Sequence, residues 1–132
     1  MISNVWNGFN GFLFCVKRSC REFYQQLFAA KITFDCGWYV NMSIGGDGPS
    51  IQFIEPQDGM PDFGGAGVVL NFKVDDVDTE YERLIDAGLL AVMPLEGHPW
   101  GDRGFSVMDP IGNSIYIYSD REPTEEYKQY YI

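Results

Sequence analysis

The spacing of apolar residues in the first half of the chain predicts one helix among four short strands. The apolar run at residues 11–16 is typical of a buried strand. Residues 19–22 then fit a capping box, in which the Ser19 hydroxyl and the Glu22 carboxylate satisfy amides at a helix start. The apolar stripe of this helix is expected at Phe23, Leu27 and Phe28. Three further strands are predicted at residues 31–36, 38–44 and 50–55.

The second half repeats this order. Residues 67–74 predict a strand, and an acidic turn leads into a helix that Asp78 or Thr79 can cap. Gly88 supplies the left-handed stop of this helix. Its buried face is expected at Val77, Tyr81, Leu84 and Ile85. Three strands follow at residues 90–95, 104–108 and 114–119, with a strong turn signal at 109–113.

An internal echo indicates a duplicated α+β domain. Residues 48–54 resemble residues 112–118, so Gln52 and Tyr116 are expected at equivalent strand positions. We predict a single domain over residues 1–132 with βαβββ modules at about 9–56 and 66–120. A Gly/Pro-rich linker at 57–65 joins them, and a tail at 121–132 carries tyrosines that can pack on this chain or on a partner. Two such modules can form a curved mixed sheet around a trough-like pocket.

Charge and cysteine content narrow the possible partners. The net charge of −10 would repel phosphate backbones, which argues against nucleic acid, and it would attract a cationic ligand. The same charge can also serve solubility alone. No apolar run is long enough to span a membrane. Cys15, Cys20 and Cys36 are odd in number and follow no secretory signal, which favours reduced thiols and a cytoplasmic location.

Residues 99–113 carry the most specific motif, a Trp-Gly-Asp-Arg segment followed by Asp-Pro-Ile-Gly-Asn. Together with residues 23–28 and 72–78, this motif resembles the vicinal oxygen chelate superfamily. That superfamily includes glyoxalase I, extradiol dioxygenases, fosfomycin-resistance transferases and bleomycin-resistance proteins. The likeness extends over roughly residues 11–120.

The resemblance implies metal ligands (His, Gln or Glu) on the first and last strand of each half, and this chain departs from that pattern. Val69 and Tyr116 stand at two of the positions, and Phe9 or Gly11 at a third. Only Gln52 could bind a metal, and one neutral amide does not make a site. The resemblance therefore implies a protein that binds a small molecule without metal or other cofactor, as the bleomycin-resistance proteins do.

Other side chains offer alternative chemistry. His98 is either a catalytic group or a plain loop residue. Arg103 either forms a surface ion pair or contacts an anion in the trough. The acidic group of Asp75, Asp76 and Asp78 looks like paired carboxylates, but it also suits the start of a helix. No catalytic residue is assigned.

Aromatic side chains are the best candidates for ligand contact. Trp38, Trp100, Tyr116 and Tyr118 can stack on a planar ligand, and the resemblance places Tyr116 facing the trough. We expect a homodimeric binding or sequestering protein of the antibiotic-resistance type, with an aromatic or cationic ligand. Two alternatives stay open: a divergent lyase or dioxygenase of the same superfamily, and a subunit or regulator whose aromatic tail is the interface. Whether the protein is an enzyme is also open.

Overall fold

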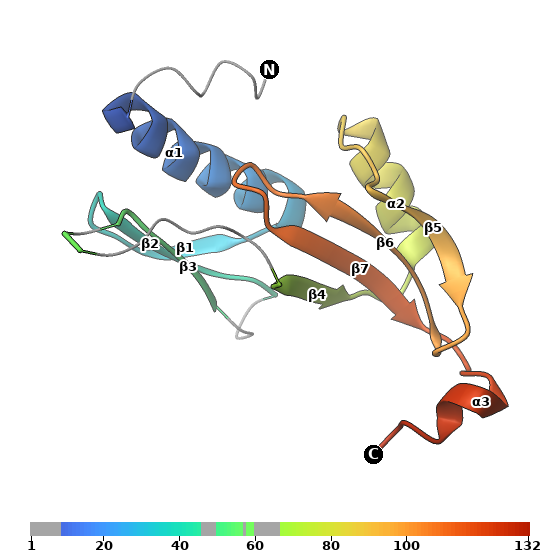
Figure 1. The fold of residues 1–132 in the computed structure, drawn as a ribbon. Coiled ribbons are helices and arrows are strands. Elements are labelled where there is room, and N and C mark those ends of the chain that lie inside the picture. Colours follow the sequence, from blue (N-terminus) through green and yellow to red (C-terminus); the bar gives the residue numbers. More distant parts are fainter. Residues whose placement is uncertain (1–8, 46–49, 57, 60–66) are drawn as a thin grey trace. The chain divides into compact units, whose positions relative to one another are not determined.

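The chain forms two compact units, residues 1–64 and 65–132. The computed structural model describes residues 9–45, 50–56, 58–59 and 67–132, with the backbone alone for residues 9–18. Each unit combines helix and sheet (Figure 1), which confirms the predicted α+β class. The predicted linker at 57–65 lies outside the described residues except at Asp58 and Gly59. Within the described residues, no helix has the length and apolar character needed to cross a membrane.

The first unit packs one long helix against an antiparallel sheet of strand order β1-β2-β3. Its elements are α1 (Phe9–Phe28), β1 (Lys31–Asp35), β2 (Tyr39–Ser43) and β3 (Ser50–Ile54). Tyr24 of α1 is fully buried and lies 5.5 Å from the ring of Phe53 on β3. Val40 and Met42 of β2 are also fully buried. Removing these side chains from water stabilises the unit.

The predicted strand at residues 11–16 is wrong, because these residues belong to α1. An apolar run of this length does not by itself distinguish a strand from a helix, and no proline ends the helix between residues 9 and 28. Phe9 and Gly11 therefore occupy helical positions and not strand positions. Ser19 lies inside the helix, so the predicted capping box does not form. The described order in this unit is αβββ and not βαβββ.

The second unit has the predicted βαβββ order. Its elements are β4 (Val69–Lys73), α2 (Val77–Asp86), β5 (Met93–His98), β6 (Asp102–Met108) and β7 (Ser114–Asp120), followed by the short helix α3 (Glu125–Lys128). The strand order is β4-β7-β6-β5. β4 runs parallel to β7 and the other pairs are antiparallel, so this sheet is mixed.

The starts of α2, β5 and β6 differ from the prediction, and β6 begins at Asp102 and not at residue 104. The side chain of Asp76 caps α2 by accepting from the Thr79 amide at 3.1 Å, so neither Asp78 nor Thr79 is the cap. Asp76 has the extended backbone that an N-cap requires. β5 begins at Met93 and not at residue 90. Leu90 lies in the preceding loop, where it is 83% exposed, so its apolar character did not mark a buried strand. The stop at Gly88 is confirmed by its φ of 96°.

The two faces of the four-stranded sheet differ in their cover. Helix α2 covers one face through the fully buried Val77 and Leu84, and Tyr81 contacts Phe105 edge to face at 5.1 Å. The Ser119 hydroxyl accepts from the Val77 amide at 3.1 Å, which holds the start of α2 on β7. The apolar strand residues buried on this face are Phe105, Val107, Ile115 and Ile117. Because side chains alternate along a strand, the residues between them point to the opposite face.

Candidate functional site

A carboxylate surrounded by aromatic residues lies on the sheet face opposite α2. Asp102, the first residue of β6, accepts from the phenol of Tyr116 at 2.8 Å and from the indole N–H of Trp100 at 2.9 Å. The Nδ1 atom of His98 lies 2.8 Å from the same carboxylate. These partners come from β5, the β5–β6 loop and β7, and the side chain of Asp102 is only 12% exposed. We call Asp102, His98, Trp100 and Tyr116 the aromatic–carboxylate cluster.

His98 is held on two sides within this cluster. Its ring stacks on Trp100 with centroids 4.3 Å apart and planes 4° from parallel. Nδ1 faces the Asp102 carboxylate, and among the described residues Nε2 has no hydrogen-bond partner. The nearest charged group is Glu96, whose Oε1 lies 3.6 Å from Nε2. The His98 ring is therefore fixed in orientation, and its side chain is only 7% exposed.

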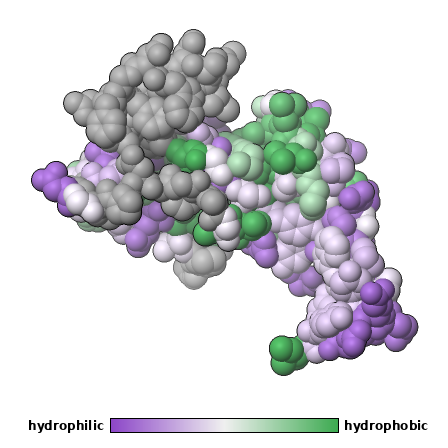
Figure 2. All heavy atoms as spheres, viewed as in Figure 1, coloured by the Kyte–Doolittle hydropathy of each residue, from purple (hydrophilic) through white to green (hydrophobic). Residues whose placement is uncertain are grey.

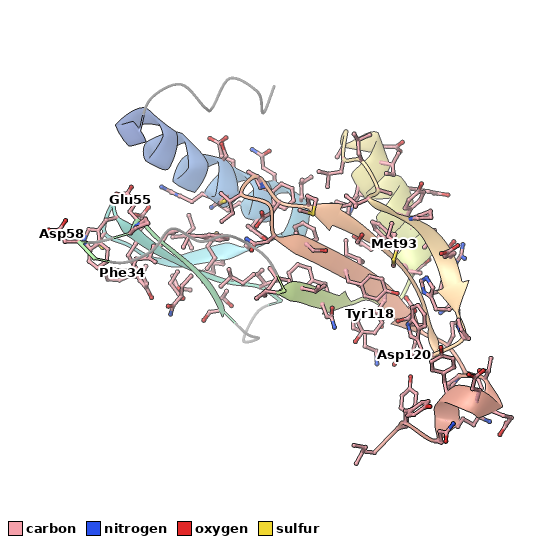
Figure 3. All side chains as sticks on the ribbon, viewed as in Figure 1. Phe34, Glu55, Asp58, Met93, Tyr118 and Asp120 are labelled. Atoms are coloured by element: carbon pink, nitrogen blue, oxygen red, sulfur yellow. The ribbon has the colours of Figure 1, made fainter. Side chains whose placement is uncertain are left out.

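Tyr116 presents its phenol as a hydrogen-bond donor. Burial, followed by the hydrogen bond to Asp102, raises the pKa of Tyr116 well above its usual value. The ring of Tyr118 stacks beside it at 5.6 Å and 13°. Gly104 on β6 makes room for Tyr116, because a Cβ at Gly104 would lie 2.6 Å from the phenol oxygen. Figure 3 shows Tyr118 and Asp120 in the second half of β7, toward α3.

The raised pKa of Tyr116 predicts a distinct alkaline titration. Tyr116 stays protonated through the pH range near 10.0 in which an ordinary tyrosine ionises. Because the pKa is higher in the folded state, the stabilisation is present below pH 10.0 and is lost as pH rises further. We expect the tyrosinate absorbance of wild type and Tyr116→Phe to be equal near pH 10.0 and to diverge only above it. A difference that is already complete at pH 10.0 would contradict the burial argument.

The structure brings four predicted site residues together on this face, namely His98, Trp100, Tyr116 and Tyr118. Val69 lies on the same face, because it pairs with Ser114 on β7, two residues before Tyr116. Its side chain is 55% exposed.

Arg103 points the other way. Its guanidinium binds the carboxylate of Asp78 on α2, with the shortest contact at 2.8 Å. The hydrogen bond from Arg103 lowers the pKa of Asp78. Because Asp102 and Arg103 are consecutive on β6, their side chains leave opposite faces of the sheet. Of the acidic group predicted at the start of α2, Asp76 is the cap and Asp78 holds Arg103.

The remaining predicted site residues belong to the first unit. Gln52 is exposed on β3 and pairs with Asn41 on β2. Trp38 precedes β2, is 46% exposed, and lies 6.0 Å from the ring of Tyr39.

Among the described residues, no three His, Cys, Asp or Glu side chains gather into a metal-ligand group. The expected absence of a metal stays a prediction.

Asp102 is the main site residue that the sequence prediction missed. It lies within the quoted Trp-Gly-Asp-Arg segment, two residues from Trp100. The available signal was alternation: on a strand starting at residue 102, Asp102 and Gly104 share a face, whereas Arg103 does not. The strand predicted from residue 104 leaves out Asp102 and therefore does not place its side chain on a face.

The family model named Glyoxalase-like domain matches residues 9–122. The chain belongs to this family. The match confirms the resemblance to the vicinal oxygen chelate superfamily inferred from residues 99–113. Uncharacterized proteins of Mycobacterium bovis and Mycobacterium tuberculosis are 42% identical to this glyoxalase-like chain over 50 residues, which is 38% of the chain. That segment spans 33% of the first relative and 29% of the second, so the chain matches about a third of their length.

Solved structures share the glyoxalase-like fold at low sequence identity. A glyoxalase/bleomycin resistance protein/dioxygenase superfamily member from Sphaerobacter thermophilus has a TM-score of 0.65 and 22% identity, covering 79% of this chain and 88% of its own. An antibiotic binding protein from Streptomyces has a TM-score of 0.65 and 23% identity, covering 79% and 86%. A lactoylglutathione lyase from Agrobacterium tumefaciens has a TM-score of 0.63 and 19% identity, covering 77% and 84%.

Proposed function

We propose that this glyoxalase-like protein binds and sequesters an aromatic or cationic small molecule, without metal, on the sheet face that α2 leaves uncovered. The aromatic–carboxylate cluster carries the proposal. It combines flat rings, a phenol oxygen and a carboxylate in one place, held by β5, β6, β7 and the β5–β6 loop. Small-molecule sites typically combine apolar rings with a few placed polar groups.

The chemistry of the cluster favours a planar ligand of positive charge. The rings of Tyr116 and Tyr118 are stacked nearly parallel, with centroids 5.6 Å apart. A cation over such a ring gains about 0.5–2 kcal/mol, depending on how far it is desolvated. The protein's net charge of −10 raises the local concentration of cations and repels anions. Figure 2 shows a surface of mainly intermediate hydropathy over β7, as tyrosine-rich regions have.

Several finer statements belong to the same proposal. The antibiotic binding protein from Streptomyces shares the fold, and this likeness supports a role in holding an antibiotic-like compound. A homodimer, contributions from Gln52 and Trp38 of the first unit, and a cytoplasmic location stay predictions. Arg103 is left out of the proposed ligand contacts because it binds Asp78.

The proposal predicts that Tyr116→Ala weakens binding of proflavine, a planar aromatic cation. Loss of the ring and of its phenol should raise the dissociation constant about tenfold, which corresponds to about 1.4 kcal/mol. Binding is measured by dye fluorescence, and the melting temperature of each variant is recorded alongside. Naphthalene sulfonate, a planar anion, should bind more weakly than proflavine to the wild type.

Leu90→Ala is the matched control, because Leu90 is the most exposed apolar side chain of the α2–β5 loop at 83%. It tests whether the dye merely adheres to exposed apolar surface, and its affinity should equal that of the wild type. If Tyr116 only fills space, Tyr116→Ala will lower stability and leave proflavine affinity unchanged. That result would remove Tyr116 from the site.

A further inference from the structure

The C-terminal tail binds the loop that carries Trp100. After β7, the Arg121 amide donates to the Gly101 carbonyl at 2.9 Å, and the Thr124 amide donates to the Pro99 carbonyl at 2.9 Å. The phenol of Tyr131 donates to the Trp100 carbonyl. All three backbone carbonyls of the loop at residues 99–101 therefore accept hydrogen bonds from residues 121–131.

The fit between tail and loop is close. Gly101 has a φ of 112°, and a Cβ there would lie 2.7 Å from the Tyr131 oxygen and 3.1 Å from the Cβ of Pro123. The ring of Tyr127 meets the Trp100 ring edge to face at 6.3 Å. The tail thus contacts both the backbone of this loop and its aromatic side chain.

Trp100 is consequently held from two directions. The cluster holds its indole through Asp102 and His98, while the tail holds its backbone. Without the tail, the loop would keep its indole contacts and the hydrogen bond from the Gly101 amide to the His98 carbonyl, but it would lose the hydrogen bonds that residues 121–131 donate to its carbonyls. The family model ends at residue 122, so the tail hydrogen bonds to two of the three loop carbonyls and the Tyr127 ring contact come from residues beyond the matched domain. Figure 1 shows α3 directly after the end of β7.

We infer that the tail is a positioning element for the ligand site: it fixes the β5–β6 loop so that Trp100 stays stacked on His98 before a ligand arrives. A pre-ordered ring loses less conformational freedom on binding, which raises affinity without adding a contact. The expected gain in ligand affinity rests on the proposed function. The expected ordering of the Trp100 ring by the tail is independent of that function.

Thr124→Pro tests the inference with little other change. Thr124 has a φ of −67°, which proline adopts, and its amide and hydroxyl both donate to the Pro99 carbonyl. The substitution removes both donors and leaves the Thr124 carbonyl to accept from α3. Thr124→Val is the matched control, because it keeps the amide and loses only the hydroxyl.

The readout is hydrogen exchange of the Trp100 indole N–H, followed by NMR on the full chain and assigned by its loss in Trp100→Phe. We expect exchange about fivefold to tenfold faster in Thr124→Pro, as for the loss of one hydrogen bond. Thr124→Val should stay within about twofold of the wild type. Amide exchange in β6 and β7 should not change, which separates loop release from general destabilisation.

A chain ending at Glu122 removes the contacts of Thr124, Tyr127 and Tyr131, keeps the hydrogen bond from the Arg121 amide to the Gly101 carbonyl, and provides the second test. We expect faster indole exchange than in Thr124→Pro, and proflavine affinity about tenfold weaker than in the full chain at a similar melting temperature. Tyr130→Phe is the control for loss of a tail phenol, since Tyr130 is 69% exposed and its ring contacts Tyr127.

The outcomes separate the two proposals. Unchanged indole exchange in both Thr124→Pro and the shortened chain would overturn the positioning role, whatever the dye does. If the full chain binds neither proflavine nor naphthalene sulfonate, the proposed ligand class fails, and indole exchange still decides the role of the tail. Faster exchange together with weaker proflavine binding supports both.

Discussion

Asp102→Ala is expected to lower the free energy of unfolding by about 3–5 kcal/mol, because one carboxylate serves three partners in the aromatic–carboxylate cluster. Each hydrogen bond to a charged group contributes about 1.5–3 kcal/mol, and part of this is recovered when water reaches the exposed indole of Trp100. The His98 side chain, only 7% exposed, has the least access to replacement water. Urea denaturation followed by circular dichroism measures the change.

Asp120→Ala is the matched control for Asp102→Ala. Asp120 ends β7 in the same unit and pairs with Lys73, but its side chain is 62% exposed. Exposed ion pairs contribute about 0–1 kcal/mol, so this variant should unfold almost as the wild type does. Asp102→Asn keeps the size and one acceptor oxygen and should fall between the two. Equal unfolding midpoints for Asp102→Ala and Asp120→Ala would show that the cluster does not stabilise the sheet.

Gly104→Ala is expected to cost about 1–3 kcal/mol of stability, as overpacking of a filled site does. A Cβ at Gly104 would lie 2.6 Å from the Tyr116 ring and oxygen and 2.8 Å from the backbone oxygen of Ile117. The carbonyl of Ile117 belongs to β7 and cannot yield easily, so Tyr116 must move and lose its hydrogen bond to Asp102. Proflavine affinity should fall with stability.

Gly97→Ala on β5 is the control, since a Cβ there meets nothing within 4 Å. A double-mutant cycle then isolates the contact between Gly104 and Tyr116. Gly104→Ala should cost less in a Tyr116→Ala background, and the remaining cost measures the clash with the Ile117 carbonyl. The steric argument fails if Gly104→Ala and Gly97→Ala have the same unfolding midpoint.

Local sequence patterns determined most of the second unit. The stripe of α2 and the stop at Gly88 follow from contacts between near neighbours in the chain, and both are present. The turn at 109–113 forms as expected, with the Asp109 carboxylate accepting from the Ile111 and Asn113 amides. The motif around Trp100 was specific enough to identify the family.

The helical start of the first unit was not determined in this way. Residues 11–16 are apolar without a clear period, and such a run suits a buried strand and a buried helix equally. In the helix, Cys20 and Tyr24 lie on the packed face, where both are fully buried. These two residues are four apart, but the predicted stripe of Phe23, Leu27 and Phe28 did not include them.

The sequence by itself therefore determined the family and the α+β class, and it named Trp100, Tyr116 and Tyr118 among four aromatic candidates, of which Trp38 lies in the first unit. Only the tertiary structure decided which polar groups join them. Asp102 meets His98 and Tyr116 through strand pairing, whereas its neighbour Arg103 turns to α2. The tail's attachment to the Trp100 loop joins residues about thirty positions apart, as in the bond from Tyr131 to Trp100. Such contacts depend on strand register and alternation over the whole sheet, which no local pattern of residues encodes.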